Sequence, residues 1–284
     1  MTGSHPSIAD KRRAFRKLHE SGCFVIPNPW GAGSARYLQG LGFKALATTS
    51  SGFAHAQGLA DGVVSRDEML AHIRELAEVS DIPVNADFEG GYADDPAGVA
   101  ESVRLCVETG VAGLSIEDST SDDANPLYPF DLALTRVRAA RAAIDKAGGD
   151  VLFTARTEGF IKNRPDLDET IRRLRAFSDA GADCLYAPGI KTREQIEAVV
   201  KAVAPKPVNF LMSAAHTLTV DDLASMGVRR ISVGGTLARV AWTAFINSAR
   251  EIAQQGKFGS FAGTVPNAEL NKFFHDDFPR RPKS

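Results

Sequence analysis

One local pattern recurs along the sequence and restricts the possible folds more than any other feature. A helical stretch ends at a glycine, a short apolar or β-branched run follows, and a polar loop comes next. Eight such runs are present, at residues 23–28, 44–49, 82–87, 111–117, 151–156, 183–188, 207–212 and 229–233. Short strands that alternate with helices pair in parallel through right-handed crossovers. Eight units of this kind predict an α/β fold, the (β/α)8 or TIM barrel.

The length of 284 residues fits one barrel, which needs about 250 residues. We predict a single domain over residues 1–284, with an N-terminal helix in 1–20, the barrel in 21–250 and a C-terminal helix or tail in 251–284. A doubly wound sheet is the competing fold. It is less favoured because no Gly-x-Gly-x-x-Gly motif follows the first strand, and Gly234-Gly235 comes only after the last one.

Charge and composition argue against several classes of partner. The formal net charge of −2 gives no reason to expect a nucleic acid as partner. Two basic clusters, at residues 11–17 and 172–175, have helical spacing, and we interpret both as solvated helix faces. No apolar run approaches the roughly 18 residues of a membrane span, and three widely spaced cysteines fit a reducing compartment. We therefore expect a cytoplasmic protein without a membrane partner.

Polar side chains gather at the ends of the third, fourth and fifth predicted strands, where α/β barrels place their catalytic groups. Under the two-residue periodicity of strands, the residues that share a face are Asn85, Asp87 and Glu89, then Ser115 and Glu117, then Thr154, Arg156 and Glu158. If these faces point inward, several carboxylates surround one arginine, and they repel one another unless a cation or protons offset them. Mg²⁺ suits such a site, with Mn²⁺ as an alternative, because it prefers oxygen ligands. The other interpretation is an internal salt-bridge network.

Single residues at these strand ends leave alternatives open. Arg156 either binds a substrate carboxylate through paired hydrogen bonds or only pairs with Glu158. Asp61 lies in a glycine-bounded loop, residues 58–62, that either folds over the site or simply turns the chain.

Residues of the other loops are also candidates. Trp30 either lines a pocket or packs in the core, and we assign Asn209, on the seventh strand, to substrate binding. The run Ser50-Ser-Gly-Phe53 offers hydroxyl and N–H groups to a carboxylate oxygen, or forms an ordinary turn. His55 and His216 lie in loops, and each is either a proton carrier or a surface residue.

A series of motifs resembles the isocitrate lyase / phosphoenolpyruvate mutase superfamily over about residues 24–242. In chain order the motifs are Pro27-Asn-Pro-Trp30, Ser34-Ala-Arg36, Thr48-Thr-Ser-Ser-Gly52, Gly58-x-x-Asp61, Asn85-Ala-Asp87 through Gly91-Tyr92, Gly113-Leu-Ser-Ile-Glu-Asp118, Ala155-Arg-Thr-Glu158 and Ala180-Gly-Ala-Asp183. The resemblance implies a barrel, commonly with a C-terminal helix exchanged between subunits of a homodimer or homotetramer. It also implies Mg²⁺ and a small carboxylate substrate, a 2-oxo acid or its enolpyruvyl relative.

The resemblance also implies roles for residues at matching positions. Those implied to hold the substrate carboxylate are Ser51, Gly52, Phe53 and, from the other side, Arg156. Those implied to anchor the metal, mostly through its waters, are Asp61, Asp87 and Glu117. Asn85 stands where the superfamily usually has an aspartate, so it keeps an oxygen ligand but removes one negative charge. Glu89 is an extra carboxylate before the glycine-tyrosine pair.

The loop at residues 119–127 departs furthest from the superfamily pattern. Isocitrate and methylisocitrate lyases carry a Lys-Lys-Cys-Gly-His run whose cysteine moves a proton, whereas this loop holds no Cys, Lys or His. The phosphonate-handling members use a Lys and an Asn there, and only Asn125 could match. The first two activities are therefore not expected, and phosphorus–carbon chemistry is less favoured.

The remaining expectation is a Mg²⁺-dependent carbon–carbon lyase or decarboxylase that acts next to the enolate of a small 2-oxo or 2-hydroxy acid. The catalytic candidates are Arg156, Glu117, Glu89 and Glu158. Decarboxylation needs no general base, whereas a retro-aldol or retro-Claisen lyase would need one, such as Glu89, Glu158 or His55. The alternatives are a phosphonomutase-type enzyme and a non-catalytic 2-oxo acid binding protein.

Overall fold

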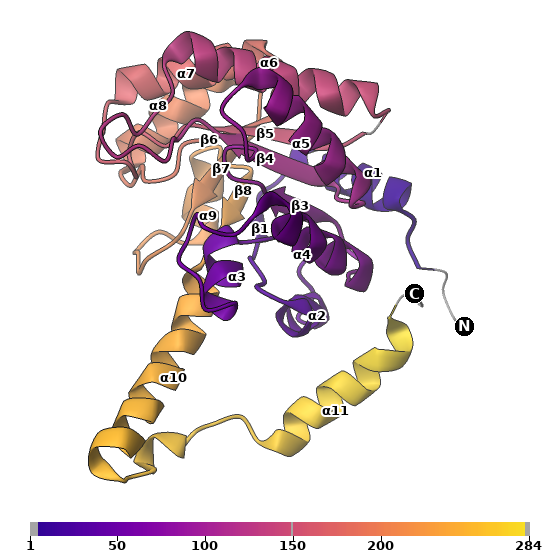
Figure 1. Cartoon of the computed structure of the whole chain (residues 1–284), viewed down its shortest axis with the longest axis vertical. Helices are drawn as coiled ribbons and strands as arrows, with labels where there is room; N and C mark the ends of the chain where they lie inside the picture. The colour runs from indigo at the N-terminus through magenta and orange to yellow at the C-terminus, as the bar shows by residue number, and fades with distance from the viewer. Residues whose placement is uncertain (1–4, 149, 282–284) are drawn as a thin grey trace.

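A computed structural model describes residues 5–148 and 150–281 and confirms the predicted barrel (Figure 1). Eight parallel strands form one sheet: β1 (Phe24–Ile26), β2 (Leu46–Ala47), β3 (Val84–Asp87), β4 (Gly113–Glu117), β5 (Leu152–Arg156), β6 (Cys184–Tyr186), β7 (Val208–Leu211) and β8 (Arg230–Ser232). Each strand lies within the run predicted for it, because the glycines and polar loops that bound the runs also end the pairing.

The strand order is β1-β8-β7-β6-β5-β4-β3-β2. The N–H of Ala47 on β2 donates to the carbonyl of Pro27 just after β1, at 3.1 Å, so the two ends of the sheet meet. Because the strands are parallel, their carboxyl ends lie together at one mouth. The register between β4 and β5 sets Glu117 directly beside Arg156 at this mouth.

The crossover helices cover the outside of the barrel: α2 (Ala32–Gly40), α4 (Arg66–Val79), α5 (Pro96–Glu108), α6 (Phe130–Lys146), α7 (Leu167–Asp179), α8 (Arg193–Val203) and α9 (Val220–Ser225). A further short helix, α3 (Ser50–Ala56), begins immediately after β2 at the mouth. Ser65 and Thr192 form capping boxes, and Asp95 caps α5 before a proline, as their sequence signals indicate. No helix of the described ranges is both long and apolar enough to cross a membrane.

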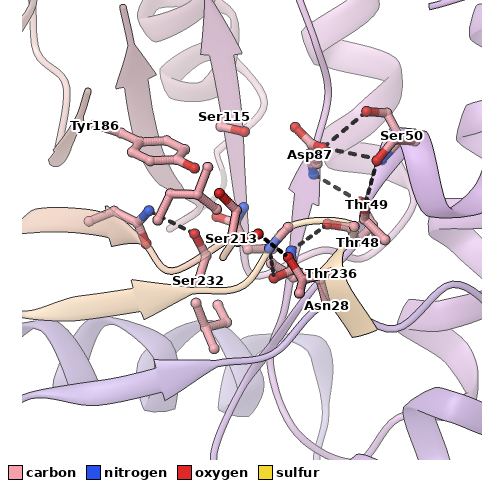
Figure 2. A pocket seen from close by; sticks show the side chains of 18 of the residues that line it. Asn28, Thr48, Thr49, Ser50, Asp87, Ser115, Tyr186, Ser213, Ser232 and Thr236 are labelled. Carbon is pink, nitrogen blue, oxygen red and sulfur yellow. Dashed lines mark hydrogen bonds between the residues drawn. The ribbon is translucent and has the colours of Figure 1, made fainter. Parts of the chain in front are cut away.

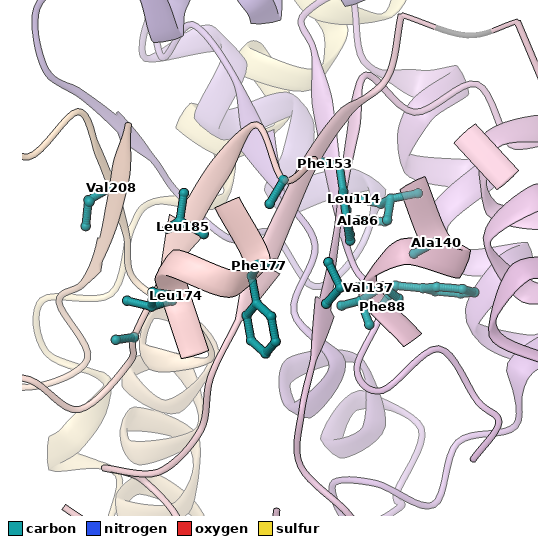
Figure 3. Close-up of a cluster of buried hydrophobic side chains, with 14 of the residues drawn as sticks. Ala86, Phe88, Leu114, Val137, Ala140, Phe153, Leu174, Phe177, Leu185 and Val208 are labelled. Atoms are coloured by element: carbon teal, nitrogen blue, oxygen red, sulfur yellow. The ribbon is translucent and has the colours of Figure 1, made fainter. Parts of the chain in front are cut away.

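The main hydrophobic core lies between the outer face of the sheet and these helices. Figure 3 shows Leu114 near Val137 and Ala140 of α6, with Phe177 of α7 in the same cluster. Ala86 and Phe88 belong to this core, whereas the alternate residues of β3 face the barrel interior. The predicted parity of β3 is therefore confirmed.

Helix α1 (Ile8–Glu20) closes the amino-terminal end of the barrel. Phe15 is fully buried there against Ile26 and other small apolar residues of the barrel floor. Arg13 and Lys17 of the basic cluster on α1 are exposed as predicted, whereas Lys11 is not. The Lys11 ammonium is buried and donates to the carbonyls of Ala77, at 2.8 Å, and Ser80, at 2.5 Å. The predicted exposure was wrong for Lys11 because a long cationic side chain can cap carbonyls at the end of a neighbouring helix.

The C-terminal part of the chain leaves the barrel. Helix α10 (Thr236–Gln255) projects away from the body, and α11 (Asn267–Asp277) returns toward α2 (Figure 1). The predicted limit of the barrel at residue 250 thus falls inside α10. The buried guanidinium of Arg36 on α2 donates to Asp277 at 2.5 Å and holds α11 to the barrel.

Candidate active site

Two joined cavities open at the carboxyl ends of the strands. The smaller one, of about 240 Å³, reaches down into the barrel, and Figure 2 shows Asp87 with Ser50 on one side of it and Tyr186 with Ser232 on the other. The larger one, of about 750 Å³, lies above β3, β4 and β5. Ser50, Asp61 and Arg156 line both. The predicted acidic strand ends therefore converge on one continuous site.

Arg156, the last residue of β5, lies at the junction of the cavities. Its Nη1 is 3.1 Å from Asp87 Oδ1 and 3.3 Å from Glu117 Oε2, and its Nε donates to Glu158. Burial opposes the charge of the guanidinium, but Glu117 and Glu158 outweigh it and hold the pKa of Arg156 well above its ordinary value. The arginine is therefore a permanent cation shared by three carboxylates.

Asp87 is held in place by the start of α3. Its Oδ2 accepts hydrogen bonds from the N–H of Ser50 at 3.1 Å and from the Ser50 hydroxyl at 3.2 Å. Its own N–H donates to the Thr48 hydroxyl at 2.9 Å. One carboxylate oxygen thus faces α3 and the other faces Arg156.

The site contains more carboxylates than its arginine can neutralise. Burial, followed by the nearby Asp87 and Glu117, raises the pKa of Glu89 to about 7. Burial also raises the pKa of Glu158, against the effect of Arg156, and raises the pKa of Asp61, with Asp87 adding to the shift. This excess of negative charge favours a cation at the site.

Glu158 is positioned by a buried ion pair that the sequence did not reveal. Asp118 accepts hydrogen bonds from the N–H of Glu158 at 2.9 Å, from the Thr157 hydroxyl at 2.8 Å and from Arg173 at 3.0 Å. Arg173 is buried rather than part of a solvated face of α7. Its helical spacing from Thr170, Leu174 and Phe177, which form the buried face of α7, was the available signal.

Three residues predicted to bind substrate lie behind the cavity wall. The Phe53 ring stacks on His72 of α4 at 3.9 Å, and its N–H donates to Thr49 within α3. The Gly52 N–H faces the Thr49 hydroxyl at 3.3 Å, and a Cβ on Gly52 would lie 3.2 Å from Cβ of Trp30. Because the chain turns into α3 at Ser50, Phe53 faces α4, and none of the three residues lines either cavity.

The remaining predicted residues line the site. Ser51, Asn85 and Asn209 line the smaller cavity, and Glu89, Glu117 and Glu158 line the larger one. Two arginines of the smaller cavity, Arg230 on β8 and Arg239 on α10, were not predicted. Arg230 shares the parity of Ser232, so its inward orientation could have been read from the periodicity.

The loop at residues 119–127 forms a small hairpin, closed by a bridge between Ser119 and Leu127. The Ser119 hydroxyl donates to Glu117 at the rim of the larger cavity. The amide of Asn125 is exposed and donates to Asp122 at 2.9 Å. The residue that could match phosphonate chemistry thus bonds within its own loop.

Carboxylates gathered around a buried arginine at the carboxyl ends of the strands of an α/β barrel mark an enzyme active site. The family model for phosphoenolpyruvate phosphomutase matches residues 15–253, and the chain belongs to this family, within the isocitrate lyase / phosphoenolpyruvate mutase superfamily.

Known proteins of several activities are similar to this chain. An oxaloacetate decarboxylase of Paraburkholderia xenovorans is 30% identical over 248 residues, which cover 84% of this chain and 80% of that protein. A Burkholderia cenocepacia structure described as a lyase/mutase is 46% identical, with a TM-score of 0.91, and covers 94% of this chain and 97% of its own. Oxaloacetate acetylhydrolase, solved with its product oxalate, is 27% identical with a TM-score of 0.85 and coverages of 96% and 97%.

Proposed function

We propose that this chain is a Mg²⁺-dependent carbon–carbon lyase or decarboxylase acting next to the enolate of a small 2-oxo acid. The observation that carries the proposal is the position of Arg156, at the junction of two cavities and among the carboxylates of Asp87, Glu117 and Glu158. Such an arginine can bind a substrate carboxylate while the neighbouring carboxylates hold a cation. The similarity to an oxaloacetate decarboxylase supports the same chemistry.

The oxygen donors at the site fit a divalent cation. Asp61, Asp87 and Glu117 offer carboxylates to the cavities, and the Oδ1 of Asn85 is buried without a hydrogen-bond partner in the described structure. Within residues 5–148 and 150–281 no group of three or more His, Cys, Asp or Glu side chains is placed to hold a metal ion together, so one or two of these carboxylates would bind the ion and water would supply most of its shell, as is usual for Mg²⁺. When bound, the ion supplies Lewis-acid stabilisation of the charge that develops on the substrate oxygen.

Arg156 is arranged to bind the substrate carboxylate. A guanidinium has five N–H donors, and here Nε donates to Glu158 while Nη1 faces Asp87 and Glu117. Nη2 donates to no acceptor of the described residues and so can donate to a ligand in the cavity. The Tyr186 ring, 5.1 Å from the guanidinium carbon, flanks it on the barrel side.

The residues that line the two cavities are sufficient for decarboxylation, which needs no general base. When the carboxylate β to the carbonyl of a 2-oxo diacid leaves as CO₂, the bonding electrons remain as an enolate, and no base has to remove a proton. The enolate then takes a proton from water, which needs no residue of the hairpin at 119–127. A retro-aldol or retro-Claisen reaction would need a base, and Glu89 and Glu158 line the larger cavity, where a base would act. His55 lines neither cavity and interacts with Asp61 instead.

Turnover assays test the proposal. The full chain with Mg²⁺ should convert oxaloacetate to pyruvate above the spontaneous rate, and Asp87→Ala and Arg156→Ala should abolish both this turnover and oxalate binding while the far-UV circular dichroism spectrum is retained. Conversion of phosphonopyruvate, followed by phosphorus NMR, without turnover of oxaloacetate would overturn the proposal in favour of a phosphonomutase. Mg²⁺-dependent oxalate binding without turnover of any candidate acid would favour a binding protein.

A further inference from the structure

The enolate of the proposed reaction has to take up a proton to become a 2-oxo product, and few side chains at the site can deliver one. Among the described residues that line the two cavities there is no histidine and no cysteine, and Lys162 is the one lysine. The hairpin at residues 119–127 contains none of these three residue types. Lys162, in the loop after β5, therefore provides the one amine at this site.

The tyrosines that line the cavities are poor sources of this proton. The Tyr128 hydroxyl already donates to Asp94 at 2.5 Å, and the Tyr92 hydroxyl donates to Glu89 at 3.2 Å. Burial raises the pKa of Tyr128 and of Tyr186 to about 12, and it raises the pKa of Tyr92 as well. A buried tyrosine that loses its proton becomes a desolvated anion, whereas an ammonium that loses one becomes neutral.

Lys162 is placed by a tight turn directly after Glu158. The N–H groups of Ile161 and Lys162 both donate to the Glu158 carbonyl, at 3.0 and 2.9 Å, and the N–H of Arg164 donates to the Gly159 carbonyl at 2.8 Å. Lys162 is half-buried, whereas its two neighbours in the chain are exposed. The hydrogen bonds fix the backbone of the turn, and the Lys162 side chain lies against the larger cavity.

The ammonium of Lys162 is free to meet a ligand. Across the described ranges it forms no hydrogen bond or ion pair, unlike the buried Lys11, which donates to two carbonyls. Glu89 and Glu158 line the same cavity and attract the ammonium toward it. Arg156 is the other cation of the larger cavity, and a guanidinium cannot give up a proton in a protein.

We infer that Lys162 is the proton-transfer residue of this site, and that its ammonium protonates C3 of the enolate formed beside Arg156. The inference rests on the proposed function, which places the enolate where the two cavities join. The electron pair of the enolate forms the new C3–H bond, the C2–O bond becomes a carbonyl again, and the amine regains its proton from water. In the reverse direction the neutral amine removes a proton from C3 of the product.

Hydrogen exchange of the product tests the inference apart from carbon–carbon cleavage. In D₂O the full chain with Mg²⁺ should exchange the methyl protons of pyruvate faster than Mg²⁺ alone, as proton NMR would show. Lys162→Ala and Lys162→Arg should both slow this exchange by about 100-fold, because arginine keeps the charge without transferring a proton. Lys201→Ala, at an exposed lysine of α8, is the matched control and should exchange pyruvate like the wild type.

Rescue by a free amine separates proton transfer from a structural role. Ethylamine added to Lys162→Ala should restore the exchange in proportion to its concentration, and a loss of exchange without this rescue would overturn the inference. Exchange at the wild-type rate in either variant would also overturn it and would assign the proton to a carboxyl group or to water. A wild-type chain that turns over oxaloacetate but does not exchange pyruvate overturns the inference alone. A chain that does neither and does not bind oxalate overturns the proposed function as well.

Discussion

Arg156 Nη1 lies 3.1 Å from Asp87 Oδ1, so the group proposed to bind substrate is paired with a carboxylate proposed to hold the cation. A cation at Asp87 would compete for that carboxylate and leave the guanidinium freer to bind an anion. Mg²⁺ and oxalate should therefore bind cooperatively, each raising the affinity of the other by the same factor, about tenfold or more.

Calorimetry can measure this coupling as oxalate titrations at increasing Mg²⁺ concentration. Asp87→Asn should reduce the coupling factor toward one, since it removes the shared charge. A wild-type oxalate affinity that does not change with Mg²⁺ would contradict the expectation.

Asn85 provides a second test of the cation site. Its Oδ1 is buried at the cavity without a partner among the described atoms, where the superfamily usually has an aspartate. Asn85→Asp adds a carboxylate of nearly the same shape, and it should tighten Mg²⁺ binding by about tenfold. The dependence of turnover on Mg²⁺ concentration measures this change. Ser115→Ala, which alters the same cavity without adding charge, should leave the Mg²⁺ dependence as it is.

Much of the fold and half of the site follow from local sequence. Glycines and short apolar runs fix the strands, and two-residue parity brings Asp87, Glu117 and Arg156 together, because these are properties of single strands and their shared mouth. The position of Phe53 did not follow, since it depends on the direction in which the chain enters α3.

The burial of two cationic side chains was the other feature that the sequence did not predict. Lys11 and Arg173 have the helical spacing of surface residues, yet Lys11 caps two carbonyls and Arg173 pairs with Asp118. Each of these partners lies more than 50 residues away in sequence; Ala77, for example, is 66 residues from Lys11. Hydropathy cannot distinguish a solvated charge from one that meets a distant partner in the folded chain.

The buried pair of Arg173 with Asp118 should matter for stability. Arg173→Met leaves the Asp118 carboxylate buried with fewer partners, and we expect a loss of about 3 kcal/mol in the free energy of unfolding. Arg172→Met, the neighbouring residue with an exposed ion pair to Glu169, should cost less than about 1 kcal/mol. Urea denaturation of both variants measures the contrast, and equal losses would show that the buried pair is unimportant.

Stability should also depend on His72. Burial lowers the pKa of this histidine to about 4, below the value of about 6.5 in an unfolded chain. The unfolded chain therefore binds the proton first, and stability falls as the pH drops from about 6.5 to 4, by up to about 1.4 kcal/mol per pH unit. His72→Phe keeps a ring on Phe53 and should reduce this decline, as urea denaturation at pH 7 and 5 would show. His275→Phe, on the exposed face of α11, should leave the decline unchanged.

The exposed apolar side chains of helix α10 predict that the chain associates with copies of itself. It projects from the barrel (Figure 1). Its apolar side chains lie in solvent, among them Val240 and Phe245, each 61% exposed. An apolar helix of this length is stable in water when another surface covers it. Light scattering coupled to size exclusion should therefore give a dimer or tetramer, and Phe245→Asp should shift it toward the monomer. Leu41→Asp, at an equally exposed apolar residue after α2, is the control and should keep the wild-type mass. A monomeric wild-type chain at micromolar concentration would contradict the prediction, because the apolar face of α10 would then be stable without a partner subunit.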